Sequence, residues 1–135
     1  MSESSLLRER LESVLEALER IPRRFAEIRS ADDFSRSEEG QDRLDAICMI
    51  LIAAGEAFKQ IDRKTEGKLL ARYPEVEWSG VKGVRDVIAH GYFDIDAEEV
   101  FGICQTDIPV LTRWSCSASF SKRCDGRLRK SIFNG

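Results

Sequence analysis

Two stretches of this chain repeat their apolar residues at the spacing of an α-helix, and this pattern constrains the fold more than any other feature. The first stripe advances in alternating steps of four and three residues, through Leu7, Leu11, Val14, Leu18, Ile21, Phe25 and Ile28. Such spacing places these side chains on one face of a helix that packs against a partner. We expect Pro22 to kink this helix rather than end it, because the stripe continues in phase beyond the proline.

The polar segment of residues 30–40 is predicted to be a loop that leads to a second helix. The stripe of this helix comprises Leu44, Ile47, Leu51, Ala54, Phe58 and Ile61, and it is widened by Cys48, Ile50 and Ile52. An apolar arc this wide predicts burial on more than one side. Ala53, Ala54 and Gly55 are small enough to let another helix approach closely.

Shorter helical segments follow the second stripe. Residues 65–73 can form a short helix that Pro74 ends, because the residue before a proline is disfavoured in the helical region. A third main helix is predicted from Trp78 to about His90. The pattern as a whole predicts an all-α bundle of four to five helices.

Asp96 is predicted to cap a fourth helix, with Glu99 as its reciprocal acid. The apolar residues of this helix are Val100, Phe101, Cys104, Ile108 and Leu111, and we expect Pro109 to kink or end it.

The C-terminal segment does not continue the helical pattern, so we divide the chain into a helical domain, residues 1–113, and a tail, residues 114–135. The serine-rich alternation of residues 114–121 leaves three conformations open: a short strand, an arm across a neighbouring subunit, or a terminus without a fold of its own. The tail carries five basic residues and one acidic residue, a net charge of +4. Because the whole chain has a net charge of −3, the first 113 residues carry a net charge of −7. An acidic body argues against a broad nucleic-acid-coating surface, and any contact with RNA should be local.

The length of 135 residues suits one compact domain, with 42% hydrophobic and 33% charged residues as in globular proteins. No apolar run approaches the roughly 20 residues of a transmembrane helix, and the N-terminus lacks a secretory pattern, so we expect a cytoplasmic protein. The four cysteines, Cys48, Cys104, Cys116 and Cys124, form no Cys-x-x-Cys pair, and the chain has one histidine. This composition argues against a zinc site and a disulfide framework, and we expect no metal or cofactor.

The third helix carries that histidine. On a projection of about 100° per residue, one apolar arc that must face the core is formed by Val81, Val84, Val87 and Ile88. Arg85, Asp86 and His90 then share a polar arc on the other side of the helix.

These polar residues can perform acid–base and phosphate chemistry. Asp86 lies four residues before His90, so its carboxylate can favour the protonated imidazole and restrict its orientation. Such a histidine can act as a general acid or base, and the Arg85 guanidinium suits phosphate oxygens. Gly91 is expected to end the helix and turn Tyr92 back towards this site. The alternative interpretation is a helix C-terminus that carries a favourable cation and an ordinary aromatic residue.

The segment from Arg85 to Tyr92 resembles the signature of the HEPN superfamily, in which an arginine and a polar residue precede a histidine. The tyrosine two residues after the histidine resembles the HepT-like toxin branch. The similarity extends to Tyr73-Pro74-x-x-x-Trp78 and to the acidic turn at residues 94–96, and it covers about residues 5–113.

The resemblance implies a metal-independent endoribonuclease toxin of a prokaryotic toxin–antitoxin pair, with a HEPN-like fold. It implies a homodimer in which the two motifs meet at an interfacial cleft. His90 would be the acid or base, Arg85 would bind the scissile phosphate, and Asp86 would orient the pair. The implied partner is a small nucleotidyltransferase antitoxin, and Tyr92 matches the position at which such partners attach AMP.

Two other interpretations stay open beside the nuclease. The same helix could belong to a non-catalytic module that binds a nucleotide or a partner protein, or to a purely structural helical dimer. A second helix that is apolar on several sides has more apolar surface than one small core needs, so we predict a twofold dimer.

Overall fold

The structure is a computed structural model that describes the backbone of residues 3–74, 76–89 and 94–118. Within these ranges, the side chains at residues 3–4, 85–87, 89 and 114–118 are not described. Every regular element in the described ranges is helical, which confirms the predicted all-α bundle. None of these helices combines the length and the apolar character needed to cross a lipid bilayer.

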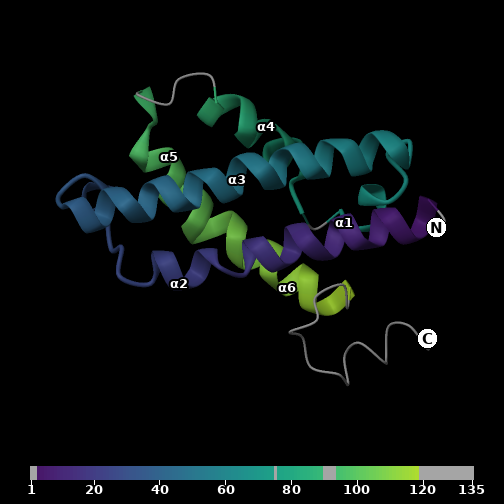
Figure 1. The fold of residues 1–135 in the computed structure, drawn as a ribbon, viewed down its shortest axis with the longest axis horizontal. Coiled ribbons are helices and arrows are strands. Elements are labelled where there is room, and N and C mark those ends of the chain that lie inside the picture. Colours follow the sequence, from purple (N-terminus) through teal and green to yellow (C-terminus); the bar gives the residue numbers. More distant parts are fainter. Residues whose placement is uncertain (1–2, 75, 90–93, 119–135) are drawn as a thin grey trace.

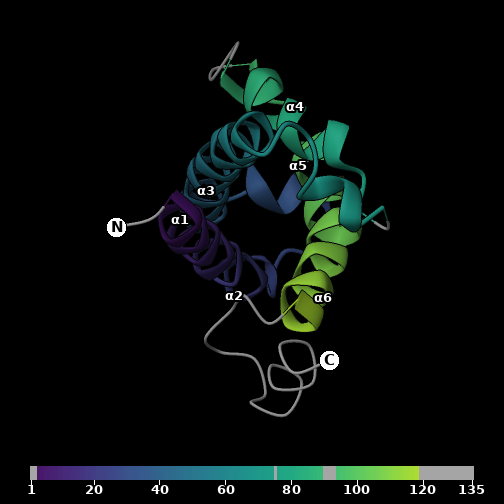
Figure 2. The ribbon, with the colours of Figure 1, turned by 90° about the vertical axis from the view of Figure 1, so that its right-hand side faces the viewer.

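Six α-helices and three short helical turns follow one another along the described chain. Their bounds are α1 (Glu3–Leu18), α2 (Ile21–Phe25), η1 (Ala31–Phe34), α3 (Glu38–Lys64), η2 (Leu70–Arg72), α4 (Trp78–Ala89), α5 (Ala97–Gly102), the π-helical turn η4 (Ile103–Asp107) and α6 (Ile108–Ala118). The longest helix, α3, crosses the whole molecule, with α1 on one side and α4 on the other (Figure 1). Viewed from the end, α1, α3, α4 and α6 surround a common interior (Figure 2).

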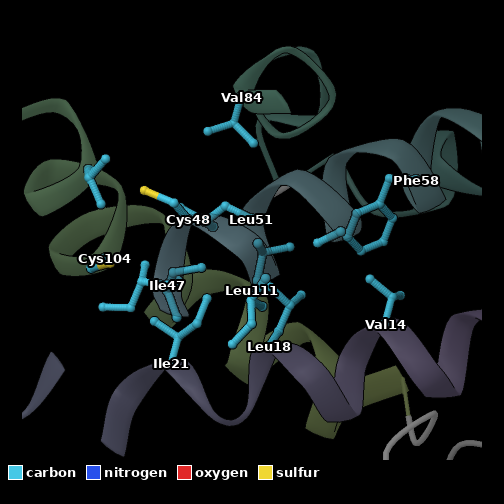
Figure 3. Close-up of a cluster of buried hydrophobic side chains, with 14 of the residues drawn as sticks. Val14, Leu18, Ile21, Ile47, Cys48, Leu51, Phe58, Val84, Cys104 and Leu111 are labelled. Atoms are coloured by element: carbon cyan, nitrogen blue, oxygen red, sulfur yellow. The ribbon is translucent and has the colours of Figure 1, made fainter. Parts of the chain in front are cut away.

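The apolar stripe of α3 accounts for its central place in the bundle. Its buried residues include the whole predicted stripe with Cys48 and Ile50, whereas Ile52 is only half-buried, and the helix packs against α1, α4 and α5. Ile47, Phe58 and Ile61 are completely buried, and Figure 3 shows Ile47 and Phe58 among side chains from several other helices. The prediction that this helix is buried on more than one side is confirmed.

The prediction of one kinked helix through Pro22 is wrong, because the chain forms two helices there. The helix α1 ends at Leu18, and the Arg20 amide donates to the carbonyl of Ala17 at 3.1 Å, which tightens the last turn. Pro22 is the second residue of α2. An N–H in the first turn of a helix has no acceptor within that helix, so the proline costs no hydrogen bond there. The apolar stripe continues in phase because both helices pack on the same core, with Ile21 fully buried.

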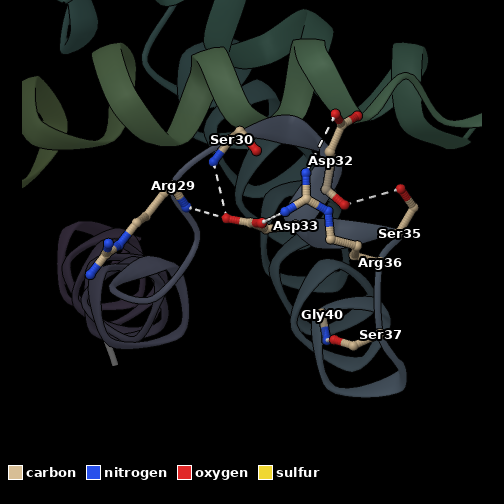
Figure 4. Close-up of polar contacts among 8 residues, drawn as sticks. All are labelled: Arg29, Ser30, Asp32, Asp33, Ser35, Arg36, Ser37 and Gly40. Carbon is tan, nitrogen blue, oxygen red and sulfur yellow. Dashed lines mark hydrogen bonds and ion pairs between the residues drawn. The ribbon is translucent and has the colours of Figure 1, made fainter.

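The polar segment of residues 30–40 is more ordered than a plain loop. It contains η1, and α3 already begins at Glu38. The Asp33 carboxylate accepts hydrogen bonds from the amides of Arg29 at 2.8 Å and Ser30 at 3.2 Å (Figure 4). These bonds, with Arg36 nearby, hold the pKa of Asp33 below its usual value, the Arg29 amide having the largest effect.

Gly40 in the first turn of α3 lies directly against η1. Its amide donates to the Ser37 hydroxyl at 3.0 Å, so Ser37 caps the helix. A Cβ at position 40 would overlap the carbonyl oxygen of Asp33. Only glycine therefore lets η1 and α3 approach as they do.

At its other end α3 finishes in a left-handed turn. Glu66 and Gly67 have φ angles of 55° and 77°, and the Gly67 amide donates to the Asp62 carbonyl at 2.8 Å. The short helix predicted over residues 65–73 is reduced to turns and the 3₁₀ segment η2. Leu70 is the buried residue of this segment.

The predicted fourth helix is present but distorted. Asp96 caps α5 by accepting from the Glu98 amide at 2.9 Å. The distortion expected at Pro109 takes the form of the π-helical turn before it, in which the Ile108 amide donates to Ile103 five residues back. Since α6 continues to Ala118, the strand considered for residues 114–121 is wrong for residues 114–118.

Cys48 and Cys104 are free, buried thiols in the core. Burial raises the pKa of Cys48 to about 11, with a smaller effect of Asp45. Burial also raises the pKa of Cys104 to about 12, with a smaller effect of the neighbouring Cys48. Both thiols therefore remain protonated and unreactive near neutral pH.

Candidate active site

The helix that carries the sequence motif is α4, and its first turn is fixed by an aromatic anchor. The Trp78 indole N–H donates to the Tyr73 carbonyl at 2.9 Å, which ties the start of α4 to the segment before it. The Trp78 ring also packs against Phe58 of α3, with ring centroids 5.1 Å apart. Because Phe58 is fully buried, this contact fixes the start of α4 on the core.

The apolar face of α4 lies against the bundle as the sequence predicts. Val84 and Ile88 are buried, and Val81 is half-buried. The side chain of Val87, the fourth residue of the predicted apolar arc, lies outside the described residues. A small hollow of about 30 Å³ remains at this contact, bordered by Gly55 on α3 and by residues of α4. The rotation of α4 about its axis is therefore set by its buried face.

An ion pair gives α4 a second attachment to α3. The Lys82 ammonium lies 2.7 Å from the Asp62 carboxylate, and both side chains are about three-quarters covered by the protein. This pair was not predicted from the sequence, because its members are 20 residues apart and no local spacing links them. Lys82 lies one turn before Arg85, so the pair fixes α4 close to the motif.

The structure describes the candidate catalytic residues in part. Arg85 and Asp86 lie in the last two turns of α4, and their side chains are outside the described part. His90 and Tyr92 lie outside the described residues, directly after the last residue of α4, Ala89. The predicted meeting of these four side chains therefore stays a prediction.

The chain on either side of residues 90–93 is anchored to the core. Ile88 is 2% exposed on the N-terminal side, and Val100 of α5 is 1% exposed on the C-terminal side. Ile95 also packs against the core, directly after Asp94. The described residues on both sides of positions 90–93 are thus fixed on the core.

A pair of acidic residues at the opposite end of α4 was also missed by the sequence analysis. Glu77 and Asp107 line a hollow of about 110 Å³, together with Thr106 and Gly80. Burial raises the pKa of Asp107, and the nearby Glu77 raises it further. The hollow lies by the first turn of α4, whereas the motif is in its last turns, so it is a separate feature.

In the part of the chain that the structure describes, no group of three or more histidine, cysteine, aspartate or glutamate side chains could hold a metal ion. At the end of α4 the sequence places the residues of the motif. An arginine such as Arg85 suits phosphate binding, and a histidine such as His90 suits proton transfer.

Comparison with known proteins places these features in a family. The family described as "Ribonuclease HepT-like" matches residues 14–116, about three-quarters of the chain, which include α4 and the whole motif. A Thermococcus cleftensis protein named "Probable ribonuclease HepT" is 33% identical over 75% of this chain and 84% of its own length. A Methanocaldococcus jannaschii protein named "Putative RNase" is 28% identical over 63% of this chain.

The match to the Methanocaldococcus protein spans 64% of that protein's length, slightly less than two thirds. No solved structure gives a significant match to this chain. The family match is nevertheless extensive, and it coincides with the all-α fold and with the helix that carries the motif. The chain therefore belongs to the HepT-like ribonuclease family, and its fold is the all-α, HEPN-like bundle expected from the sequence.

Proposed function

We propose that this protein is an endoribonuclease that cuts RNA through Arg85, Asp86 and His90 without a metal ion. The observation that carries the proposal is the family match over residues 14–116, which contains the complete motif. The names of the two relatives, a putative RNase and a probable ribonuclease, support RNA as the substrate. The buried face of α4 adds a physical argument, because it leaves the opposite arc of that helix for the polar residues.

Each motif residue has a distinct role in the proposed reaction. The His90 imidazole removes a proton from the attacking hydroxyl, or its protonated form returns a proton to the leaving oxygen. Arg85 binds the scissile phosphate and stabilises the additional negative charge on it in the transition state. Asp86, four residues before His90, orients the imidazole and favours its protonated form.

The proposed site is a cleft between two copies of the chain, in which each copy contributes its motif. Met49 on α3 supports an interface, because this large apolar side chain is 70% exposed. Light scattering at micromolar protein should give the mass of a dimer. A monomer mass under those conditions would exclude the interfacial cleft.

The proposed partner is a nucleotidyltransferase antitoxin that adds AMP to Tyr92, two residues after His90. A nucleotide there would bring negative charge and bulk to the phosphate site and block RNA. Mass spectrometry of protein produced with and without the partner would detect the added AMP on the peptide that contains Tyr92. A cytoplasmic location, where RNA and such a partner are present, belongs to the same proposal.

RNA cleavage in excess chelator tests the nuclease proposal. We expect cleavage by the wild-type protein, and a decrease of about 10²- to 10³-fold in Arg85→Ala, which lacks the charge that stabilises the transition state. Arg72→Ala is the matched control, because Arg72 is an exposed arginine of η2. Tight binding of a nucleotide or partner without any cleavage would instead favour the non-catalytic module.

A further inference from the structure

The outer surface of α1 contains a hollow of about 600 Å³. We call it the α1 hollow, and it is lined by Leu6, Leu7, Glu9, Arg10, Glu12, Ser13, Glu16 and Lys64. It lies on the side of α1 that faces away from the core. It combines one exposed apolar side chain, Leu6 at 50% exposure, with three glutamates and two cations, Arg10 and Lys64.

Two of these glutamates make no ion pair within the described part of the chain, although Arg10 and Lys64 also line the hollow. Glu12 lies 3.6 Å from Arg8, and Arg10 donates to Gln60 of α3 at 2.7 Å. Among the described residues, Glu9 and Glu16 have no ion-pair partner, and they lie seven residues apart on one face of α1. The α1 hollow therefore offers two carboxylates that pair with no described cation, about two helical turns apart and next to an apolar residue.

The C-terminal segment, residues 119–135, has the complementary composition. It contains five basic residues and one acidic residue, and its apolar residues include Phe120 and Phe133. The segment follows Ala118 at the end of α6, and α6 packs against α1 within the same bundle (Figures 1 and 2). Its 17 residues can extend over about 55 Å, whereas the 16 residues of α1 span about 24 Å, so the whole hollow is within reach.

We propose that residues 119–135 dock in the α1 hollow of their own chain. The basic side chains of this segment pair with Glu9 and Glu16, and one of its apolar side chains covers Leu6. The same glutamates repel the phosphates of RNA, so the occupant is the basic segment rather than the substrate. The proposal involves only α1 and the C-terminal segment. Its tests are therefore independent of the tests of the motif on α4.

Zero-length carbodiimide cross-linking tests this docking, because it joins a carboxylate to an amine only where the two are in contact. We expect links from Glu9 or Glu16 to Lys122 or Lys130 after digestion and mass spectrometry. The Asp62–Lys82 pair, 2.7 Å apart, is the internal positive control. Absence of the links to the C-terminal segment, while the control link forms, would overturn the proposal.

An equal mixture of ¹⁴N- and ¹⁵N-labelled protein identifies the chain that each link joins. Docking within one chain predicts links that contain a single isotope. Links that join the two isotopes would show that the segment docks on a second copy, which also contradicts the proposal.

Limited trypsin digestion provides a second, quantitative test. An exposed ion pair contributes about 0.2–1 kcal/mol, so the double charge reversal Glu9→Lys/Glu16→Lys should speed cleavage after Arg127 and Arg129 by about five- to tenfold. The control Asp42→Lys/Glu99→Lys changes the net charge equally at exposed acids of α3 and α5. Equal rates for wild type and the α1 variant, or an equal increase in the control, would contradict docking in the α1 hollow.

Discussion

The two ends of α3 are attached to the bundle by different kinds of contact. At the N-terminal end, the contacts involve backbone groups: Gly40 lies directly against the Asp33 carbonyl, and the Arg43 side chain donates to the Arg24 carbonyl at 3.2 Å. At the C-terminal end, side chains attach α4, through the Phe58–Trp78 ring contact and the Asp62–Lys82 ion pair.

This difference separates stability from activity. The close contact of Gly40 at the N-terminal end is with η1 and not with α4, so we expect a change there to affect folding alone. The C-terminal end sets the position and rotation of α4, which carries Arg85 and Asp86. A change there should affect both folding and RNA cleavage, and the variants below test this distinction.

The largest effect is expected for Phe58→Ala. Phe58 is fully buried, and its loss should destabilise the fold by about 3–5 kcal/mol, as measured by urea denaturation. Cleavage per folded molecule should also fall, because Trp78 loses the ring that positions α4. Phe25→Ala is the control, since Phe25 packs on Phe34 and Phe101 near the other end of α3. An equal loss of cleavage per folded molecule in both variants would contradict the distinction.

Gly40→Ala should destabilise the protein by about 1–3 kcal/mol, because the added methyl group forces η1 and α3 apart. Thermal unfolding would measure this loss, while cleavage by the folded fraction should remain at the wild-type rate. At Gly83 in α4 an added Cβ meets nothing within 4 Å, so Gly83→Ala should be neutral or stabilising. A neutral Gly40→Ala would show that the close approach is not required.

The sequence predicted the elements that a local pattern determines. The stripe of α3 and the start of α4 at Trp78 follow from apolar spacing and from Pro74, and the structure confirms both. The break before Ile21 was missed, because an apolar stripe continues in phase across two helices that pack on one core.

Contacts between distant residues could not be predicted in the same way. The approach of Gly40 to Asp33 and the Asp62–Lys82 pair depend on how the helices assemble, and no spacing in the sequence encodes them. For the candidate site, the sequence predicted the helix and its buried face. Whether Arg85 meets His90 depends on the geometry at the end of α4, which spacing alone does not determine.

A smaller effect is expected for Lys82→Met, which removes the ion pair to Asp62. A partly covered pair of this kind contributes up to about 1 kcal/mol, and its loss should also lower cleavage modestly by loosening α4. Lys68→Met is the matched control, because Lys68 lies 3.9 Å from Glu66 and both side chains are about four-fifths exposed. Parallel measurements of melting temperature and cleavage should separate the two variants, and identical behaviour would argue against a positioning role for Lys82.

The smallest expected effect is on the pH dependence of folding stability, through Asp33 near the N-terminal end of α3. The amides of Arg29 and Ser30, with Arg36, hold the pKa of Asp33 below its usual value in the folded protein. Its contribution to stability is therefore complete above the unfolded pKa of about 4 and is lost as the pH falls through the lowered folded value. The stability difference between wild type and Asp33→Asn should shrink over that acidic range. A difference that stays constant from neutral to acidic pH would exclude this carboxylate as its source.

The central claim, that the end of α4 performs the chemistry, is tested most directly by the cleavage rate of His90→Ala in excess chelator. The comparison requires protein with the helix content and melting temperature of the wild type. Loss of a general acid or base predicts a decrease of about 10²- to 10⁴-fold. Cleavage by folded His90→Ala at the wild-type rate would contradict the account.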